Sequence, residues 1–336
     1  MTPKVLQFND CASVARSMVT AAARTGLRWD YLPPSLVRPM RPVLGGPLRR
    51  KATYIPYRAR RMVAVGRADV VHVHYGTSAR LLREAGVPKR PYVLTLHGSD
   101  IRRQWKDSQF HGEIQRAVDE AAHVFYANND TADNALAARS DAEFLPALVD
   151  ASILPPWSPD AVQPSILFVS RWDADKGVDG QLELAAALFR AARNRARLVG
   201  LDWGPGAEAA RAAGVELLPR MPQSEFHEVM SNAHVAIGQA TNNFATSEFE
   251  ALCMGLPMAA LGTRLARPDD GTVPPVMEGP VDDVVAQVLT ALDDPRLAAS
   301  RFGSSTWAVP RYDAASYIPK LDALYRAVAG CSDVGA

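Results

Sequence analysis

Short apolar segments alternate along the chain with segments in which apolar residues recur every three or four positions. The short segments are typical of strands buried in a parallel sheet, and the helical periodicity is typical of helices that cover such a sheet. Most of the apolar segments lead into a polar loop and then a helix, which is the repeating unit of a doubly wound α/β domain. Strands are predicted at residues 4–8, 69–75, 92–96, 123–127, 143–146, 166–170, 197–201, 216–218, 235–238 and 258–260.

The segment at residues 152–164, SILPPWSPDAVQP, has four prolines and no periodicity, so it is interpreted as a linker. A chain of 336 residues is long enough for two domains. We expect a Rossmann-like domain at residues 1–151, a second one at residues 165–305, and helices at residues 306–330 that cross back to the first. The predicted fold class is therefore α/β, with two Rossmann-like domains facing a cleft.

A helix start is predicted within residues 242–260, NNFATSEFEALCMGLPMAA. Ser247 is the expected N-cap, and Glu250 three residues on completes a Ser-x-x-Glu capping box. The unpaired backbone amides of such a helix start attract phosphate groups. The carboxylate of Glu250 either caps its own helix or accepts hydrogen bonds from sugar hydroxyls beside that phosphate. The local pattern leaves both interpretations open.

Two cations lie in the loop RWDADKG at residues 171–177, directly after the first strand of the second domain. Arg171 offers a fork of donors and Lys176 a point charge, so together they suit a diphosphate, and a solvated basic loop is the alternative. Asp173 and Asp175 resemble the Asp-x-Asp motif of metal-dependent nucleotide-sugar enzymes. Because the flanking cations would repel a metal ion, no metal ligands are expected.

Histidines mark two strands of the first domain. His72 and His74, in the predicted strand DVVHVHY, lie on the same face because side chains alternate along a strand. They are interpreted as packing residues, because no nearby cysteine or carboxylate completes a metal site. His97 follows the next strand, in the sequence HGSD at residues 97–100, where this architecture binds ligands. His97 is therefore a candidate site residue, with a role in loop structure as the alternative.

Residues 38–61 contain eight basic residues and no acidic residue, and four prolines interrupt them. The prolines are expected to forbid one continuous amphipathic helix. One interpretation is a solvated, mobile excursion. The other is a site for an anionic acceptor or an anionic membrane surface, with help from Tyr54 and Tyr57.

Composition excludes several classes of function. A net charge of +1 provides no field for nucleic acid, and no run of about 18 apolar residues predicts a membrane span. No signal peptide is recognised at the start of the sequence. Cys11, Cys253 and Cys331 are odd in number and far apart, which argues against disulfides or zinc and for a reducing cytoplasm. The motifs of serine hydrolases, P-loop NTPases and zinc proteases are absent.

Several segments, taken in order, resemble a known family over most of the chain. ILFVSRWDADKG resembles its strand followed by Arg and Lys-Gly, LVGLDWGPG its Gly-x-Gly-Pro turn, and FEALCMGLPMAA the second Glu of its Glu-x7-Glu motif. VLTLHGSDI and WAVPRYDAASYIPKLDALYRAV are also similar to the family. The chain thus resembles the retaining glycosyltransferases of family 4, whose two-Rossmann architecture is called GT-B. The resemblance is strongest over residues 165–260 and weakest over the first 60.

This resemblance implies a metal-independent, retaining transfer from a nucleotide-diphosphate sugar, with no cofactor besides that co-substrate. It implies that Arg171 and Lys176 hold the diphosphate, that Glu250 holds the ribose hydroxyls, and that His97 lies near the transferred sugar. It also implies contacts for Phe244, Ala245, Thr246 and Ser247 with the phosphate or sugar, for Arg220 and Met221 with the base, for Ser99 and Asp100 with the acceptor, and for Ser13, in a loop at residues 10–13, with the phosphates.

Two positions depart from the family pattern. The first Glu of the Glu-x7-Glu motif falls on Asn242, an amide that both donates and accepts hydrogen bonds. Glu248 is out of register with the motif and is not assigned the missing role. The loop at residues 10–13 also lacks the usual Gly-Gly pair.

The expected partners are a nucleotide sugar and a small-molecule, lipid-linked or natural-product acceptor. The expected location is the cytoplasm, with peripheral membrane contact through residues 38–61. Two alternatives stay open: a nucleotide-sugar epimerase of the same architecture, and a catalytically silent nucleotide-sugar-binding partner protein.

Overall fold

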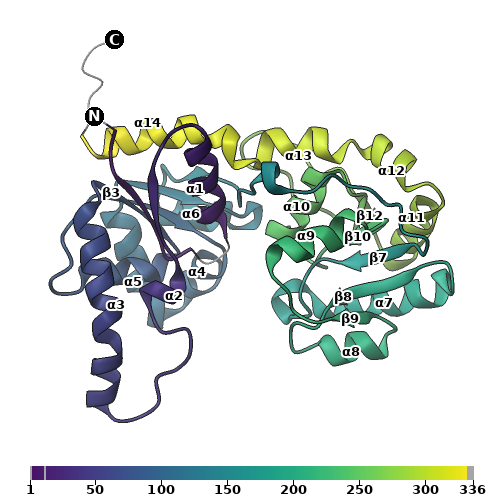
Figure 1. Ribbon diagram of the computed structural model, residues 1–336, viewed down its shortest axis with the longest axis horizontal. Coiled ribbons are helices and arrows are strands. Elements are labelled where there is room, and N and C mark those ends of the chain that lie inside the picture. Colours follow the sequence, from purple (N-terminus) through teal and green to yellow (C-terminus); the bar gives the residue numbers. More distant parts are fainter. Residues whose placement is uncertain (1, 11–12, 331–336) are drawn as a thin grey trace. The chain divides into compact units, whose positions relative to one another are not determined.

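The computed structural model describes residues 2–10 and 13–330, which form two compact units (Figure 1). Unit 1 extends to Asp150 and resumes at Ala314, whereas unit 2 comprises Ala151–Asp313. Each unit has one sheet, flanking helices and a core of its own. None of the helices within the described ranges combines the length and the apolar character needed to cross a membrane.

Unit 1 is built on a parallel six-stranded sheet in the order β2-β1-β3-β4-β5-β6. Strands β1, β3 and β4 are buried along their whole length, as expected for a sheet with helices on its faces. The strands are β1 (Val5–Phe8), β2 (Trp29–Leu32), β3 (Val70–His74), β4 (Tyr92–Leu96), β5 (His123–Tyr126) and β6 (Glu143–Phe144). The helices are α1 (Val14–Arg24), α2 (Pro34–Val37), α3 (Pro47–Arg67), α4 (Ser99–Arg102), α5 (Ser108–Glu120), α6 (Ala132–Ala138) and α14 (Ile318–Val328), with a 3-10 helix η1 (Gly76–Arg83) after β3.

Unit 2 repeats this plan with a parallel sheet in the order β12-β11-β10-β7-β8-β9. Helix α7 packs against α11, and α10 packs against α13. The strands are β7 (Ser165–Phe168), β8 (Arg197–Leu201), β9 (Glu216–Leu218), β10 (Val235–Ile237), β11 (Met258–Leu261) and β12 (Met277–Gly279). The helices are α7 (Val178–Ala192), α8 (Ala207–Ala212), α9 (Gln223–Ser231), α10 (Thr246–Met254), α11 (Val281–Asp293), α12 (Pro295–Phe302) and α13 (Ser304–Tyr312), with a 3-10 turn η5 (Ala174–Lys176) after β7.

Strand order locates the crevice of each sheet. In unit 1 the chain leaves β1 for β2 on one side and later returns to β3 on the other side, so the order reverses between β1 and β3. In unit 2 the same reversal lies between β7 and β10. Ligands of open parallel sheets bind outside the carboxyl ends of the strands at such a switch point. The loops that follow β1, β3, β7 and β10 are therefore the places to look for a site.

A buried polar network crosses the sheet of unit 1 and holds the end of the chain. The hydroxyl of Tyr325, on α14, accepts a hydrogen bond from Nε2 of Gln7 at 3.0 Å and lies 2.6 Å from Nδ1 of His72. Nε2 of His72 lies 2.7 Å from Oγ1 of Thr95, and Nε2 of His74 lies 2.9 Å from Oε1 of Gln7. His72 and His74 are fully buried, which confirms their interpretation as packing residues. The network explains why α14 belongs to unit 1.

The segments expected as a linker and as returning helices differ from the prediction. Within residues 152–164, the indole of Trp157 donates to the carbonyl of Ala233 at 2.8 Å, and the N–H of Ser158 donates to the carbonyl of Ser231. This segment is thus attached to unit 2. Residues 306–313 also stay with unit 2, because α13 packs against α10, and the chain returns to unit 1 only from Ala314.

The expectation that prolines would break up residues 38–61 is wrong for its second half. Helix α3 continues through Pro56, and Pro47 occupies its first turn, where a missing N–H costs nothing. Pro56 is exposed, so water can satisfy the carbonyl that its missing N–H leaves free. Strands β2 and β12 were not predicted, because WDYL and MEG are too short and too polar to stand out.

We predict that Tyr325→Phe lowers the free energy of unfolding by about 1–3 kcal/mol, because it leaves buried polar groups of Gln7 and His72 without their partner. Denaturant unfolding measures this loss. Tyr57→Phe, at a partly buried position of α3 whose hydroxyl has no hydrogen bond with the described residues, is the matched control and should change stability by less than about 0.5 kcal/mol. Equal stability of the Tyr325→Phe variant and the native chain would contradict a stabilising role for the network.

Candidate functional site

The carboxylate of Glu248 joins the three segments that meet at the switch point of unit 2. Its Oε1 accepts hydrogen bonds from the hydroxyl of Ser170, after β7, and from the N–H of Gln239 at 3.0 Å, after β10. Its Oε2 accepts from the N–H of Ala245 at 3.0 Å, at the start of α10. The side chain is fully buried. A residue that the sequence left without a role is therefore the one that fixes both loops against the helix.

Helix α10 begins two residues before the predicted position. Its first residue is Thr246 and its N-cap is Ala245, so the expected capping box of Ser247 and Glu250 is wrong. Alanine offers no side-chain acceptor, and only the return half of a capping box is present, in which Glu248 accepts from the N-cap amide. The sequence signal was misread because the usual Ser or Thr is missing from the true N-cap.

Glu250 is free of that capping role and faces helix α9. Its Oε1 accepts a hydrogen bond from Nε2 of Gln223 at 2.5 Å and lies 3.2 Å from Nε2 of His227, out of line for a hydrogen bond. Its Oε2 accepts no hydrogen bond from the described residues. One oxygen thus orients the carboxylate, and the other keeps its capacity to accept.

The loop that carries Arg171 and Lys176 is held against the loop after β10. The N–H of Ala240 donates to the carbonyl of Lys176 at 3.0 Å. Gly177 has φ 70°, and a Cβ there would lie 2.3 Å from the carbonyl oxygen of Ala240, so only glycine allows this approach. Nε of Arg171 lies 3.4 Å from a carboxylate oxygen of Asp173. Both predicted cations therefore lie on a loop at the carboxyl end of β7.

Asp173 has a structural role in the same loop. Its Oδ1 accepts from the N–H of Asp175 at 3.1 Å and caps the 3-10 turn η5. Among residues 2–10 and 13–330 there is no group of three or more His, Cys, Asp or Glu side chains arranged to hold a metal ion. The Asp-x-Asp interpretation thus finds no further ligands in the described part of the chain.

The side chain of Arg264, which sequence reasoning missed, holds the backbone of the loop after β10. Its guanidinium donates to the carbonyls of Gln239 and Thr241 and lies 5.1 Å from the ring centroid of Phe244. Burial lowers the pKa of this arginine. The carbonyl of Asn242 accepts from the N–H of Leu265, while the Asn242 side chain is exposed. No sequence pattern around Arg264 links it to a loop more than twenty residues earlier.

The ring of Phe244 is buried and packs edge-on against Phe249, with centroids 6.2 Å apart. Only its backbone can therefore meet a ligand, together with that of Ala245, Thr246 and Ser247 at the start of α10. Those three residues are partly buried. The helix start lies between the loops fixed by Glu248, as an anion site requires.

An exposed aromatic platform follows β8. The guanidinium of Arg220 lies 4.5 Å from the ring centroid of Trp203, and that of Arg171 lies 5.9 Å from it. The Trp203 side chain is 41% exposed, and Met221 next to Arg220 is partly buried. Sequence reasoning missed Trp203, although an aromatic residue just after a strand was the available signal.

His97 lies at the carboxyl end of β4 in unit 1. Its Nε2 lies 2.9 Å from Nδ1 of His74, and its N–H donates to the carboxylate of Asp100. Burial, and then the neighbouring His74, lower the pKa of His97 to about 3. The imidazole is therefore neutral at physiological pH and joined to the buried network.

Asp100 does not fit the expected contact with an acceptor. It is fully buried, and its carboxylate accepts from the N–H groups of Gly76, His97 and Ile101. Burial raises the pKa of this carboxyl group, and the backbone hydrogen bonds oppose the rise. Its role is to fix the turns after β3 and β4. Ser99 is partly buried, and its Oγ lies 2.8 Å from the hydroxyl of Tyr75.

The early loop of unit 1 is described only in part, because residues 11 and 12 lie outside the described residues. Asp10 accepts hydrogen bonds from the N–H of Arg16 and the hydroxyl of Tyr31, both at 3.1 Å. Burial and the adjacent Asp10 raise the pKa of Tyr31. Ser13 has φ 62°, and its carbonyl accepts from the N–H of Ser17, so its backbone opens α1. Asp10 is thus engaged at this helix start.

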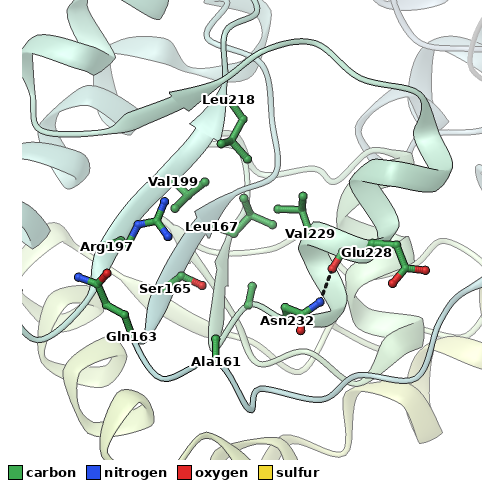
Figure 2. Close-up of a pocket in the computed structure, with 11 residues that line it drawn as sticks. Ala161, Gln163, Ser165, Leu167, Arg197, Val199, Leu218, Glu228, Val229 and Asn232 are labelled. Carbon is green, nitrogen blue, oxygen red and sulfur yellow. Dashed lines mark hydrogen bonds between the residues drawn. The ribbon is translucent and has the colours of Figure 1, made fainter.

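A pocket of about 440 Å³ lies in unit 2, between one face of β7, β8 and β9 and the helix α9 (Figure 2). Leu167 and Val199 form its floor and Val229, on α9, one wall. Ser165 and Arg197, which also line it, are the first residues of their strands. The pocket therefore extends toward the amino ends of the sheet, away from the loops where this fold binds ligands.

Comparison with known proteins agrees with this architecture. Residues 12–145 match the family described as "Glycosyl transferase 4-like domain". Within these residues the chain is thus similar to a glycosyl transferase 4-like domain. The prediction of a GT-B glycosyltransferase related to family 4 is thereby confirmed. No curated protein sequence matches the chain.

Solved structures of the same fold cover nearly the whole chain. Sucrose-phosphate synthase from Thermosynechococcus elongatus is 16% identical with a TM-score of 0.68, over 98% of this chain and 100% of that one. Anabaena HepE, in complex with UDP and glucose, is 12% identical with a TM-score of 0.66, over 96% and 99%. AviGT4, a glycosyltransferase involved in avilamycin A biosynthesis, is 19% identical with a TM-score of 0.58, over 98% of each. At these identities the likeness establishes the fold.

We predict that Glu248→Gln lowers the free energy of unfolding by about 1–3 kcal/mol, because an amide cannot accept all three hydrogen bonds and its NH₂ is buried facing donors. The loops after β7 and β10 should also exchange their amide hydrogens faster, as hydrogen exchange can measure. Glu225→Gln, exposed on α9, is the matched control and should leave both quantities unchanged. Unchanged exchange in the Glu248→Gln variant would contradict the role given to this carboxylate.

Proposed function

We propose that this protein is a retaining glycosyltransferase that moves a sugar from a nucleotide-diphosphate donor to an acceptor without a metal ion. The observation that carries the proposal is the arrangement at the switch point of unit 2. Arg171 and Lys176 lie on a loop that is hydrogen-bonded to the loop after β10, and the buried Glu248 ties both to the start of α10. Two cations and a helix start on fixed loops suit a diphosphate.

The rest of unit 2 supports a nucleotide on the same loops. The free Oε2 of Glu250 can accept hydrogen bonds from ribose hydroxyls, since Gln223 occupies only Oε1. Trp203, Arg220 and Met221 offer a flat, partly exposed surface for a base. The roles of Glu250, Arg220 and Met221 agree with what the resemblance to family 4 implies for these positions, whereas the resemblance gave no role to Trp203.

In the proposed reaction the bond between the sugar and the diphosphate breaks, and the acceptor hydroxyl bonds to the same face of the sugar. The hydroxyl proton leaves with the departing phosphate oxygen, and no covalent sugar–enzyme intermediate is required. Arg171 and Lys176 would stabilise the negative charge that develops on the leaving group. Neutral His97 can donate or accept a hydrogen bond near the transferred sugar, but it cannot carry a positive charge there.

Asn242 is the position where this chain departs from the family. Its side chain is exposed, and its carbonyl accepts a hydrogen bond from the N–H of Leu265. An amide there removes one negative charge from the vicinity of the donor sugar and adds a hydrogen-bond donor. We therefore propose that the sugar accepted, or the rate of transfer, differs from that of family members with a carboxylate.

We predict that Lys176→Ala or Arg171→Ala lowers kcat by about 100-fold or more at saturating donor, because each removes a charge that stabilises the transition state. Steady-state turnover of a nucleotide sugar measures this effect. Arg190→Ala, exposed on α7, is the matched control and should keep full activity. Full turnover by the Lys176→Ala variant would contradict the role given to this lysine. Loss of activity in EDTA would refute metal independence. A product with an inverted anomeric centre, as NMR can detect, would refute retention.

We also propose that α3 brings unit 1 to an anionic membrane surface. Leu48, Ile55 and Met62 are spaced seven residues apart, so they share one face of the helix, and they are 84%, 65% and 37% exposed. No acidic residue occurs in α3, and Arg49 and Arg50 are exposed near its start. In Figure 1 the first turns of α3 extend away from the sheet of unit 1. Exposed apolar side chains flanked by cations are typical of helices that lie on anionic lipid.

We predict that the protein floats with vesicles containing phosphatidylglycerol and not with pure phosphatidylcholine, and that high salt weakens the binding. Leu48→Ser combined with Ile55→Ser should reduce the bound fraction several-fold. Leu136→Ser, which replaces an exposed leucine on α6, is the matched control. Equal flotation of the double variant and the native chain would exclude α3 as the contact.

A further inference from the structure

A second pocket, of about 350 Å³, lies within unit 1 at the carboxyl ends of β1 and β3. Asn9 follows β1, and Ser78 belongs to the 3-10 helix after β3, so the pocket opens at the switch point of this sheet. Its volume is at the lower end of the range for small-molecule sites. Its lining residues are Asn9, Arg38, Pro39, Met40, Arg41, Pro42, Tyr54, Thr77, Ser78, Arg80 and Leu81.

The walls of this pocket are cationic. Arg38 and Arg41 come from the segment before α3 and Arg80 from the opposite side, and none of the lining residues is acidic. Arg80 forms an ion pair with Glu113, whose Oε2 lies 3.5 Å from Nη1 of Arg80. Within residues 2–10 and 13–330, no carboxylate lies within ion-pair distance of Arg38 or Arg41. An anion in the pocket would therefore meet two guanidinium charges, those of Arg38 and Arg41, that no carboxylate of the described residues neutralises.

The floor of the pocket is polar and buried. Asn9 is 3% exposed, and its Nδ2 donates to Oγ of Ser78 at 2.6 Å. Its Oδ1 has no hydrogen-bond partner among the described residues. A buried amide oxygen without a partner costs stability unless a ligand or water supplies a donor. Asn9 and Ser78 thus give the pocket a polar floor.

We infer that this pocket binds the phosphate group of a phosphorylated acceptor, held by Arg38, Arg41 and Arg80. Guanidinium groups bind phosphate oxygens in pairs, and three of them match a group with up to two negative charges. The inference rests on the proposed glycosyl transfer and names the class of its acceptor. The phosphate belongs either to a soluble sugar phosphate or to a lipid headgroup.

The test measures binding of three probes by calorimetry: inorganic phosphate, glucose 6-phosphate and short-chain dioctanoyl phosphatidylglycerol. The Arg171→Ala/Lys176→Ala chain is used as the background, because a phosphate could also bind to the loops of unit 2. We expect one of these probes to bind and glucose not to bind. Preference for glucose 6-phosphate assigns a soluble acceptor, and preference for phosphatidylglycerol assigns a lipid headgroup.

In that background, Arg38→Gln combined with Arg41→Gln should weaken binding of the probe at least tenfold, since each removes charge-assisted hydrogen bonds to phosphate. Arg28→Gln combined with Arg67→Gln removes the same charge from exposed positions of unit 1 outside the pocket, and it should change binding less than twofold. All four arginines are exposed, and equal melting temperatures confirm that the variants fold. Absence of binding by all probes, or equal weakening by both pairs of substitutions, overturns the inference.

A separate measurement distinguishes failure of this inference from failure of the proposed function. Nucleoside diphosphates should raise the melting temperature of the otherwise native chain, whether or not Arg38 and Arg41 are replaced. Stabilisation by a nucleotide without phosphate binding in unit 1 would refute the acceptor class alone. Loss of both would refute the proposed function as well.

Discussion

The candidate donor site depends on one buried carboxylate. Glu248 accepts hydrogen bonds from the segments after β7 and β10 and from the start of α10, and it does so where no water reaches it. In a medium of low dielectric such a charge is tolerated only with several donors around it, so the position of each segment is set by the others. Arg171 and Lys176 follow Ser170 in the chain, so the hydrogen bond between Ser170 and Glu248 fixes where their loop begins. The loops are therefore arranged before any ligand arrives, which is the main requirement for electrostatic stabilisation of a leaving group.

The sequence of unit 2 predicted some features of the candidate site and missed others. In unit 2 the buried strands and the cations were predictable, because apolar segments running into short polar loops have few other interpretations. The start of α10 was not, since Ala245 replaces the usual N-cap hydroxyl and the decisive carboxylate is internal to the helix. Arg264 was beyond reach for a different reason: its contacts with Gln239 and Thr241 depend on the folded path of residues 262–276, which have little regular structure. Polar side chains that act through distant backbone carbonyls leave no periodic signal.

The basic segment of unit 1 combines features that the sequence could not separate. The sequence of residues 38–61 was open to interpretation as a solvated excursion, a site for an anionic acceptor or a contact with an anionic membrane. In the structure, the residues on which the last two interpretations depend lie in different parts of the segment. Arg38 and Arg41 line a pocket with a polar floor, whereas Leu48 and Ile55 lie exposed on α3. Arg61 is buried and donates to the carbonyl of Val37, so it holds the segment together. Neighbouring parts of one basic segment thus line a pocket, expose apolar side chains and hold the segment to the rest of unit 1. The sequence alone does not separate these three roles, because they depend on the folded path of the chain.

The polar network around Tyr325 also has a consequence for biosynthesis. Gln7 and Tyr325 are 318 residues apart in the sequence, yet their side chains share a buried hydrogen bond. Unit 2, which is continuous in sequence, can complete its core while the chain is still being made, but unit 1 cannot. Until Tyr325 has been synthesised, the buried side chains of His72 and Gln7 lack their partner. The unit whose strands are made first therefore completes its polar network only after the chain of unit 2 has been made.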